Sequence, residues 1–253
     1  MKNNDLISII IPVYNASRFL PDTIESIQSQ TYDNWEAIFV NDCSIDNSTE
    51  IIKKIQKNDK RIKLINNEVN SGPALTRNKG ILSAKGDYLC FLDADDLWDN
   101  DKLEKQLNFM KKIDCAFSFT SYQYCNEKCE RTGKKVVAPK SLKYHQALKN
   151  TTISTITVMF DLHKLDKQLL MMPNIMYIED TATWWKILRT GIVAYGSSDV
   201  FSYYRRSKST LSSNKFRTLK SLWYVYRKEE KLNFIYALYC FAWKNIKAIL
   251  RRI

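Results

Sequence analysis

Four short, mainly apolar runs recur through the first half of the chain, at residues 6–13, 35–40, 62–65 and 88–92, and the first is rich in β-branched residues. Apolar residues also recur at helical spacing between these runs, at residues 20–27, 44–57 and 74–84. A continuous apolar run is typical of a strand that is buried on both faces. The alternation of such strands with helices predicts an α/β fold, with a mainly parallel sheet and right-handed crossovers over residues 6–112.

The pattern is less regular in the second half. Strands are expected near residues 115–124 and 153–160, with a polar loop around residues 126–135 between them. A helix is predicted to begin at the acidic pair Glu179-Asp180 and to end at Gly191. The order of the strands in this part of the sheet does not follow from the pattern.

Polar side chains follow three of the predicted strands, at residues 12–15, 41–42 and 93–96. Ligands of parallel sheets bind at the carboxyl ends of the strands, so these groups are expected to face one site. The third group contains three aspartates, which could share a divalent metal with oxygens of a diphosphate. Helix capping is the alternative for these aspartates, because a helix is predicted to open near Asp99. Polar groups at all three strand ends favour the ligand site.

Charge is distributed unequally along the chain. Of the net charge of +12 over 253 residues, +8 belongs to residues 214–253, which hold ten Lys/Arg against two Glu. The length is sufficient for one large α/β domain with an appendage. We therefore expect a core domain over residues 1–213 and a basic tail over residues 214–253.

The tail is predicted to form two helices, over residues 215–231 and 232–252, and the second interleaves large apolar side chains with basic ones. Its longest uncharged stretch, residues 232–243, is too short to span a bilayer. An amphipathic helix on an anionic membrane surface is one interpretation. An ordinary helix packed against the core is the other. No recognition motif accompanies the basic residues, so no nucleic-acid partner is expected.

Cysteine usage and the amino-terminal segment predict a cytoplasmic protein. The six cysteines lie in predicted strands, a loop and a helix, so reduced thiols are expected. Cys125 and Cys129 have no histidine at finger spacing, which argues against a zinc site. The first apolar segment ends at Pro12 without a cleavage-site pattern, and it is interpreted as a strand rather than a signal peptide.

An ordered series of motifs over residues 6–112 resembles the family 2 glycosyltransferases, which have the GT-A fold and use nucleotide-diphospho-sugars. The motifs are Ser-Ile-Ile-Ile-Pro-Val-Tyr-Asn at 8–15, Gln-Thr-Tyr at 30–32, Val-Asn-Asp-Cys-Ser-Ile-Asp-Asn-Ser at 40–48, Thr-Arg-Asn-Lys-Gly at 76–80 and Phe-Leu-Asp-Ala-Asp-Asp at 91–96. Each motif is weak alone, but the set occurs in family order and at family spacing. The resemblance implies a catalytic domain over 1–213, with a nucleotide-sugar-binding half (1–112) and an acceptor-binding half (113–213).

By this resemblance, Pro12, Tyr14 and Asn15 would line the nucleotide pocket, with Tyr14 stacking on the base. Asp42 would accept a hydrogen bond from the imide N–H of uracil, which favours a UDP-sugar. Arg77 would donate two hydrogen bonds to the diphosphate. The alternatives are a half-buried aromatic at Tyr14, a turn or cap aspartate at Asp42 and an exposed helix arginine at Arg77.

The family's metal-binding signature coincides with Asp93, Ala94 and Asp95, which would contact the nucleotide-sugar. Asp95 would ligate Mn²⁺ or Mg²⁺, and Asp93 would hold the ribose or support the metal site. Asp96 would cap the helix that follows. The metal would neutralise charge on the leaving diphosphate.

The sequence departs from the family at a second metal position. Many relatives have a histidine after a Tyr-Arg pair, but Tyr204-Arg205 is followed here by Arg206 and Ser207. Arg206 or Lys208 could supply positive charge instead, and both could equally be solvated loop residues.

Glu179-Asp180 resembles the acidic pair at the start of the family's acceptor-side helix. By this resemblance Asp180 would be the general base that takes the proton of the acceptor hydroxyl in a single inverting displacement. Glu179 would bind acceptor hydroxyls. The alternative is that both residues are only favourable acids in the first turn of a helix.

Together these features predict a metal-dependent, inverting hexosyltransferase that uses a UDP-sugar donor and an undecaprenyl-diphosphate-linked saccharide acceptor. The resemblance implies bacterial O-antigen, capsule or related polysaccharide synthesis, by a peripheral protein on the cytoplasmic face of the cell membrane. One alternative is a non-catalytic, membrane-associated nucleotide-sugar-binding subunit. The other alternative is a nucleotidyltransferase. That class is expected to have a Gly-rich phosphate loop after the first strand, and residues 12–15 do not contain one.

Overall fold

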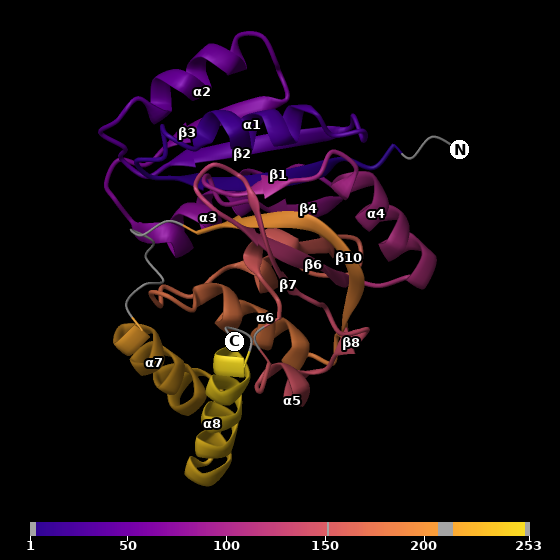
Figure 1. Cartoon of the computed structure of the whole chain (residues 1–253), viewed down its shortest axis with the longest axis vertical. Helices are drawn as coiled ribbons and strands as arrows, with labels where there is room; N and C mark the ends of the chain where they lie inside the picture. Colours follow the sequence, from indigo (N-terminus) through magenta and orange to yellow (C-terminus); the bar gives the residue numbers. More distant parts are fainter. Residues whose placement is uncertain (1–3, 151, 207–214, 251–253) are drawn as a thin grey trace.

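The computed structural model describes residues 4–150, 152–206 and 215–250. Within these residues, ten strands form one sheet through the middle of the molecule, with helices on both sides (Figure 1). The main path of the sheet has the order β3-β2-β1-β4-β9-β6-β10-β5, while β7 pairs with β6 and β8 with β10. The strands are β1 (Ile7–Val13), β2 (Trp35–Asn41), β3 (Ile62–Asn66), β4 (Tyr88–Phe91), β5 (Leu97–Trp98), β6 (Phe117–Cys125), β7 (Arg131–Val136), β8 (Ser141–Leu142), β9 (Val158–Asp161) and β10 (Ala194–Arg205).

Strand direction determines where the site lies. Strands β1 to β4 run parallel to one another. β9 is antiparallel to both β4 and β6, so β6 and its parallel neighbour β10 run in the same direction as β4. The carboxyl ends of these six strands therefore share one edge of the sheet, the carboxyl edge. The predicted α/β fold is confirmed, with antiparallel strands added to a mainly parallel core.

Helices cover the two faces of this sheet. They are α1 (Leu20–Gln28), α2 (Ser48–Gln56), α3 (Gly72–Ser83), α4 (Lys102–Ile113), α5 (Tyr144–Ala147), α6 (Glu179–Arg189), α7 (Lys215–Tyr224) and α8 (Phe234–Leu250), with single turns η1 (Thr155–Thr157), η2 (Lys167–Leu170) and η4 (Val225–Glu229). Successive residues of β1 point to opposite faces. Ile9 joins a core with α1, α2 and α4, whereas Ile10 joins a second core with α3, α6 and the C-terminal helices.

Two segments after α4 differ from their predicted structures. In the segment 126–135, expected as a loop, residues 126–130 form a turn, but residues from Arg131 return along β6 as the antiparallel strand β7, whose exposed and polar residues resemble a loop in the sequence. Residues 153–157, expected in a strand, contain η1, and β9 begins only at Val158. Because β9 is antiparallel, its amino end lies at the carboxyl edge, and η1 is therefore at the site.

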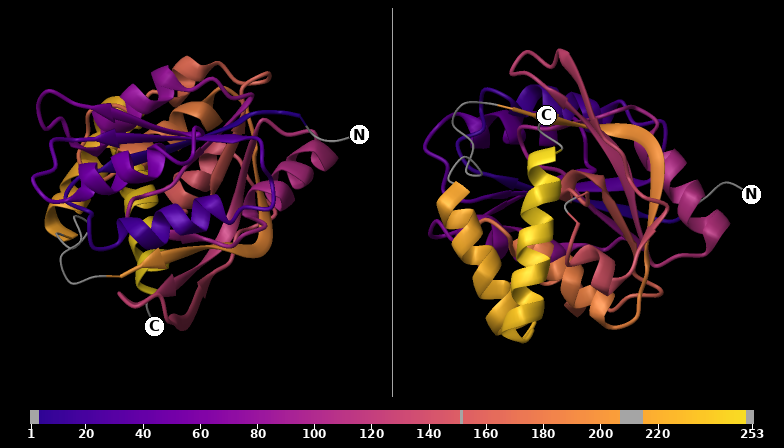
Figure 2. Two further views of the ribbon diagram at one scale, coloured as in Figure 1. Left: turned by 90° about the horizontal axis from the view of Figure 1, so that it is seen from above. Right: turned by 60° about the horizontal axis from the view of Figure 1, so that its bottom comes forward.

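The C-terminal helices pack against the core. Figure 2 shows α7 and α8 side by side as a hairpin. Tyr226, in the η4 turn between them, stacks on Trp185 of α6 with ring centroids 4.9 Å apart. The buried Glu230 accepts a hydrogen bond from Tyr144 at 2.6 Å and pairs with Arg189 at 3.0 Å. Among the described residues, no helix is long and apolar enough to cross a membrane.

Candidate active site

The residues that the sequence singles out lie on loops at the carboxyl edge. Tyr14 and Asn15 follow β1, Asp42 follows β2, and residues 93–96 follow β4. The acidic pair Glu179-Asp180 forms the first turn of α6. Hydrogen bonds and ion pairs connect these loops to one another.

The loops after β1 and β2 are linked through Asn15. Its backbone N–H donates to Ser44 Oγ at 3.0 Å, and its side-chain oxygen accepts from the Ile45 N–H at 2.9 Å. Asn15 has a φ of 50°, a left-handed conformation that asparagine tolerates better than most residues. The neighbouring Tyr14 is 55% exposed, so its ring is available to stack on a flat ligand. Pro12 is half-buried beside Val40 of β2.

Asp46 is a second link between these loops, and motif reasoning assigned it no role. Its carboxylate accepts from the Ser17 N–H at 2.9 Å, the Ser48 N–H at 3.1 Å and the Ser48 hydroxyl at 2.6 Å. Burial alone would raise the pKa of Asp46, but hydrogen bonds from Ser48 and Ser17 outweigh it and lower the pKa to about 2. Asp46 therefore holds the loop after β1 against the start of α2 in its ionised form.

The buried Asp42 holds the start of α3. Its Oδ1 accepts from Asn67 Nδ2 at 2.7 Å and from the Ser71 N–H at 2.8 Å, and its Oδ2 accepts from the Gly72 N–H at 2.8 Å. This is the capping arrangement that the sequence left open as the alternative to base recognition. The two roles are compatible, because a carboxylate offers about four acceptor positions and three are used here.

Arg77 forms the central contact of the site. Its Nη2 lies 2.6 Å from Asp93 Oδ1, and its Nη1 lies 2.9 Å from Glu179 Oε1. Burial would lower the pKa of Arg77, but the charges of Asp93 and Glu179 outweigh it and raise that pKa. Arg77 is buried, not exposed, and both of its terminal nitrogens contact carboxylates. A single side chain thus connects the loop after β4 with the start of α6.

The residues next to Arg77 strengthen the same connection. Asn78 donates to the Met172 carbonyl at 2.8 Å and accepts from the Met172 N–H at 2.7 Å, which holds the segment that leads to α6. Gly80 lets α3 approach the sheet closely, because a Cβ there would lie 2.5 Å from Ile10 Cγ2. The motif at residues 76–80 therefore joins the two halves of the domain.

The aspartates after β4 have different environments. Burial, followed by the charge of Asp93, raises the pKa of Asp95 to about 6. Asp96 is buried, and its Oδ1 accepts from the backbone N–H of Arg205 at 2.7 Å. The prediction that Asp96 caps the next helix is wrong, because β5 follows directly and α4 begins only at Lys102. Asp96 instead ties the end of β10 to the loop after β4.

Asp93 and Asp95 have the chemistry of a cation site. Hard cations such as Mg²⁺ and Mn²⁺ prefer carboxylate oxygens. A cation would also offset the burial and the repulsion by Asp93 that together raise the pKa of Asp95. These two residues could hold a metal only together with oxygens of a ligand. In the described part of the chain, the one cluster with three ligand atoms within 4.8 Å of one another is Asp5, Asp87 and His163, on the opposite edge.

Asp180 is oriented by a residue that motif reasoning missed. Thr155, in η1, donates its hydroxyl hydrogen to Asp180 Oδ2 at 2.8 Å, and Asp180 Oδ1 accepts from the Thr181 N–H at 2.5 Å. Asp180 is half-buried and lies in the first turn of α6, where a helix favours negative charge. No pattern in the sequence indicated Thr155, because its segment was expected to be a strand.

Arg205 is a second buried cation at this edge. Its Nη2 pairs with Asp22 at 3.0 Å, its Nη1 donates to the Glu127 carbonyl at 3.2 Å, and its guanidinium lies 4.6 Å from the centre of the Phe19 ring. It connects the end of β10 with α1 and with the β6–β7 hairpin. The Tyr-Arg pair in the sequence was the only signal for this contact.

Comparisons with known proteins point to one family. The family model "Glycosyl transferase family 2" matches residues 8–169. The chain is 42% identical over 248 residues to "Putative teichuronic acid biosynthesis glycosyltransferase TuaG" of Bacillus subtilis, covering 98% of both chains. It is 38% identical over 223 residues to the Escherichia coli protein "UDP-Glc:alpha-D-GlcNAc-diphosphoundecaprenol beta-1,3-glucosyltransferase WfgD", covering 87% of this chain and 85% of WfgD.

Solved structures share the fold at low sequence identity. Staphylococcus aureus TarS (residues 1–349), solved with UDP-GlcNAc, has a TM-score of 0.71 at 19% identity, over 88% of this chain and 66% of the TarS chain. The mannosyltransferase PcManGT of Pyrobaculum calidifontis, solved with GDP-Man and Mn²⁺, has a TM-score of 0.70 at 18% identity, over 92% of this chain and 66% of its own. These likenesses confirm the predicted GT-A fold. From the matching family model and relatives, the chain belongs to glycosyltransferase family 2.

Proposed function

We propose that this glycosyltransferase moves a sugar from a UDP-sugar to a lipid-linked saccharide by a metal-dependent, inverting displacement. The observation that carries the proposal is the position of Arg77. It pairs with Asp93, in the candidate metal loop, and with Glu179, which immediately precedes the candidate base Asp180. One buried cation therefore holds the donor and acceptor carboxylates at the same site.

On the donor side, Pro12, Tyr14 and Asn15 line the base pocket. The carboxylate of Asp42 uses its remaining lone-pair position to accept a hydrogen bond from the imide N–H of uracil. Asp95 and Asp93 would hold Mn²⁺ or Mg²⁺, which would supply positive charge to neutralise the leaving UDP. We assign Arg77 to positioning Asp93 instead of to direct contact with the diphosphate, since carboxylates already occupy both terminal nitrogens.

On the acceptor side, Asp180 accepts the proton of the attacking hydroxyl while Thr155 keeps the carboxylate oriented. The hydroxyl oxygen bonds to the anomeric carbon as the bond from that carbon to the diphosphate oxygen breaks on the opposite face. The configuration at the anomeric carbon inverts. Glu179 has a buried Oε2 without a hydrogen-bond partner among the described residues, and this atom is suited to accept from an acceptor hydroxyl.

The relatives support these substrate classes. The printed name of WfgD states a UDP-Glc donor and a diphosphoundecaprenol-linked acceptor, and that of TuaG states teichuronic acid biosynthesis. We infer by this similarity that the acceptor is a saccharide on a polyprenyl diphosphate and that the product enters bacterial surface polysaccharide.

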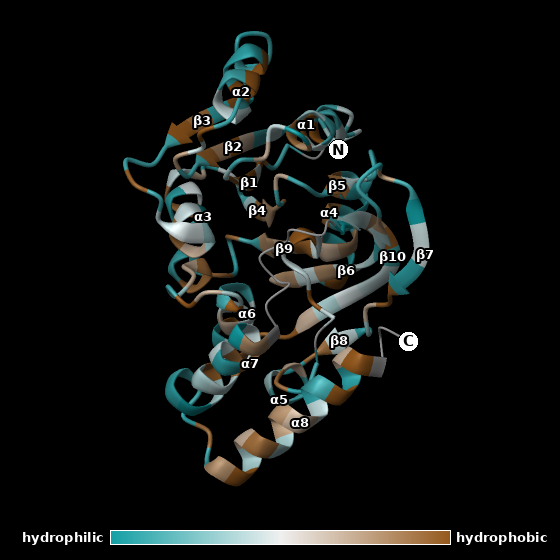
Figure 3. Cartoon of the chain, turned by 60° about the vertical axis from the view of Figure 1, so that its left-hand side comes forward, coloured by the Kyte–Doolittle hydropathy of each residue, from teal (hydrophilic) through white to brown (hydrophobic). Residues whose placement is uncertain are grey.

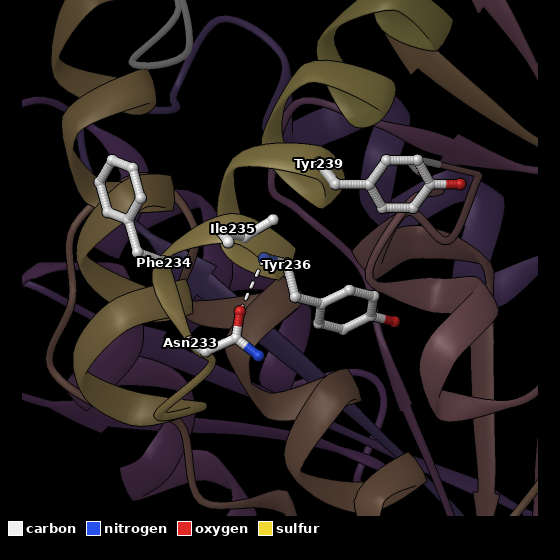
Figure 4. Close-up of a pocket in the computed structure, with 5 residues that line it drawn as sticks. All are labelled: Asn233, Phe234, Ile235, Tyr236 and Tyr239. Carbon is white, nitrogen blue, oxygen red and sulfur yellow. Dashed lines mark hydrogen bonds between the residues drawn. The ribbon is translucent and has the colours of Figure 1, made fainter.

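The outward surface of α8 supports a membrane location on the inner face of the cell membrane. Its exposed large side chains form the α8 apolar face, made of Phe234, Ile235, Leu238, Tyr239, Trp243, Ile246 and Ile249. Figure 3 shows the apolar character of α8, and Figure 4 shows the first turns, where Phe234, Ile235 and Tyr239 border a shallow pocket. A lipid-linked acceptor lies at such a surface, and amphipathic helices bind there by their apolar face.

One basic residue of the tail does not fit its expected role. Lys244 was expected among the cations that attract lipid headgroups, but it is buried on the inner side of α8. Its ammonium donates to the Asn150 carbonyl at 2.9 Å and lies 4.8 Å from the centre of the Trp185 ring. It therefore fastens α8 to the core, and the described surface of α8 is more apolar than basic.

The catalytic proposal is tested by two substitutions with a matched control. UDP release from a UDP-sugar, with Mn²⁺ and a lipid-diphosphate-linked GlcNAc acceptor, should fall by about 10²- to 10⁴-fold in Asp180→Asn, since a general base typically contributes that much. Asp95→Asn should lose the Mn²⁺-dependent part of UDP binding in calorimetry, whereas Asp180→Asn should keep it. Asp33→Asn, at an exposed position on the opposite edge, should behave as wild type. Full activity in both site variants would contradict the proposal.

A further inference from the structure

Three tyrosines cluster at the carboxyl ends of β6 and β10. Tyr124 lies edge-on to Tyr122 and to Tyr204, with ring centroids 5.5 Å and 5.8 Å apart, and the rings of Tyr122 and Tyr204 are 6.4 Å apart. Tyr122 is buried, and Tyr124 and Tyr204 are half-buried. We call these residues the tyrosine cluster. Neither the motifs nor the reaction described above gives them a role.

Contacts at the end of β10 place the tyrosine cluster close to the candidate base, with Tyr204 packed against the core that contains α1, α2 and α4. Ser202 donates to the Ile156 carbonyl at 3.1 Å, and Ser202 is aligned with Tyr122. Ile156 follows Thr155, the residue that orients Asp180. Alternate residues of a strand share a face, so Tyr204 lies on the same face as Ser202. Tyr204 is about 7 Å nearer to the carboxyl edge, because a strand rises about 3.3 Å per residue.

The donor loop lies on the other flank of the cluster. The backbone N–H of Arg205 donates to Asp96 Oδ1 at 2.7 Å, so the residue after Tyr204 is tied to the loop that carries Asp93 and Asp95. The strand order β3-β2-β1-β4-β9-β6-β10 separates the cluster from the nucleotide loops, which follow β1 and β2. The cluster therefore lies beside the reacting groups but on the side away from the nucleotide.

Arg206 adds a charged group to this surface. Its guanidinium carbon lies 3.7 Å from the centre of the Tyr124 ring, and its side chain is exposed. Stacking on an aromatic ring pre-orients a guanidinium at little cost in conformational entropy. A guanidinium held in this way can donate two hydrogen bonds to a phosphate.

We propose that the tyrosine cluster and Arg206 form the acceptor subsite, which binds the pyranose ring that carries the attacking hydroxyl. A pyranose has an apolar face of C–H groups and a polar rim, which match the ring and the hydroxyl of a tyrosine. Arg206 binds the diphosphate attached to that ring. This inference rests on the proposed function, since it names groups that would hold the acceptor opposite Asp180.

The test separates acceptor binding from donor binding. In Tyr204→Ala and Tyr124→Ala, the KM for GlcNAc-diphosphate on a short alkyl chain should rise at least tenfold. The affinity for UDP, measured by calorimetry, should stay within about twofold of wild type, because the nucleotide loops follow β1 and β2. Tyr195→Ala is the control, since Tyr195 is an exposed tyrosine at the opposite end of the same strand. Thermal unfolding of each variant shows whether it is folded.

Arg206→Gln tests the anionic part of the subsite. It should raise the KM for the diphosphate-bearing acceptor and leave the KM for the plain alkyl glycoside of GlcNAc unchanged. An unaltered acceptor KM in the tyrosine variants, or an equal rise in the KM for the UDP-sugar, would overturn the subsite. If the wild-type protein binds UDP but transfers no sugar to any lipid-linked saccharide, the proposed function fails, and that result is distinct from failure of the subsite.

Discussion

At the scale of single residues, the site depends on one cation between two carboxylates. Arg77 brings together Asp93 and Glu179, which are distant in the chain and would repel each other without it. Buried ion pairs contribute little net stability, but removal of one partner leaves uncompensated charge in a poorly solvated place. The arginine is therefore expected to be required both for the shape of the site and for the fold.

Arg77→Gln should destabilise the protein by roughly 3–5 kcal/mol, because the substitution leaves Glu179 and Asp93 without their counter-charge. Urea unfolding at pH 7 measures this change. The matched control is Lys105→Gln, which removes an exposed partner of Asp101 and should leave the free energy of unfolding nearly unchanged. Equal losses of stability in the two variants would contradict a special role for Arg77.

At the scale of elements, the carboxyl edge of the sheet is held by contacts between loops. The loops after β1 and β2 contain no helix or strand of their own until α1 and α2 begin, and Asn15 and Asp46 connect them. Asp46 satisfies backbone N–H groups at Ser17 and Ser48 that would otherwise lack a partner. The conformation offered to a nucleotide therefore depends on the ionised form of one carboxylate.

Asp46→Asn should lower the free energy of unfolding at pH 7, and the difference from wild type should disappear in acid. The folded protein lowers the pKa of Asp46 from 3.8 to about 2, so its contribution is present above pH 4 and is lost as the pH falls towards 2. Chemical unfolding of both proteins between pH 7 and pH 2 measures this convergence. Glu68→Gln, at an exposed site, serves as the control. A difference that stays constant down to pH 2 would show that Asp46 acts without its charge.

At the scale of the whole molecule, α8 is packed on one side and apolar on the other. Ala237, Cys240 and Lys244 face the core, while Ile235 remains 81% exposed. Contiguous exposed apolar surface of this kind marks an interaction site. The position of α7 and α8 beside α6 places this surface on the side of the domain that carries Glu179 and Asp180 (Figure 1).

The protein should bind vesicles that contain anionic phospholipid, and the double variant Ile235→Glu/Ile246→Glu should lose most of that binding. Each buried apolar side chain is worth about 1.5–3 kcal/mol, so the loss should exceed about tenfold. Co-sedimentation with vesicles measures binding, and Val69→Glu, at an exposed position on another part of the surface, is the control. If the wild type dimerises in solution and the double variant is monomeric, the α8 apolar face binds a second copy instead of lipid.

Much of the fold and the positions of the motif residues could be read from the chain itself. The central strands are continuous apolar runs, and hydrophobic periodicity is a local property that a sequence displays directly. The same holds for the helix that begins at Glu179. β7 and η1 were misjudged because an exposed polar strand and a buried turn carry no distinctive pattern.

The sequence alone determined the α/β class, the family and the edge of the sheet where the motif residues gather. Only the tertiary structure decided that Arg77 pairs with Asp93 and Glu179, that Asp96 contacts β10, and that Lys244 is buried. It also brought three tyrosines from two strands into one cluster. The reason is physical: periodicity records which face of an element is buried, whereas the partner of a side chain depends on contacts between segments far apart in the chain.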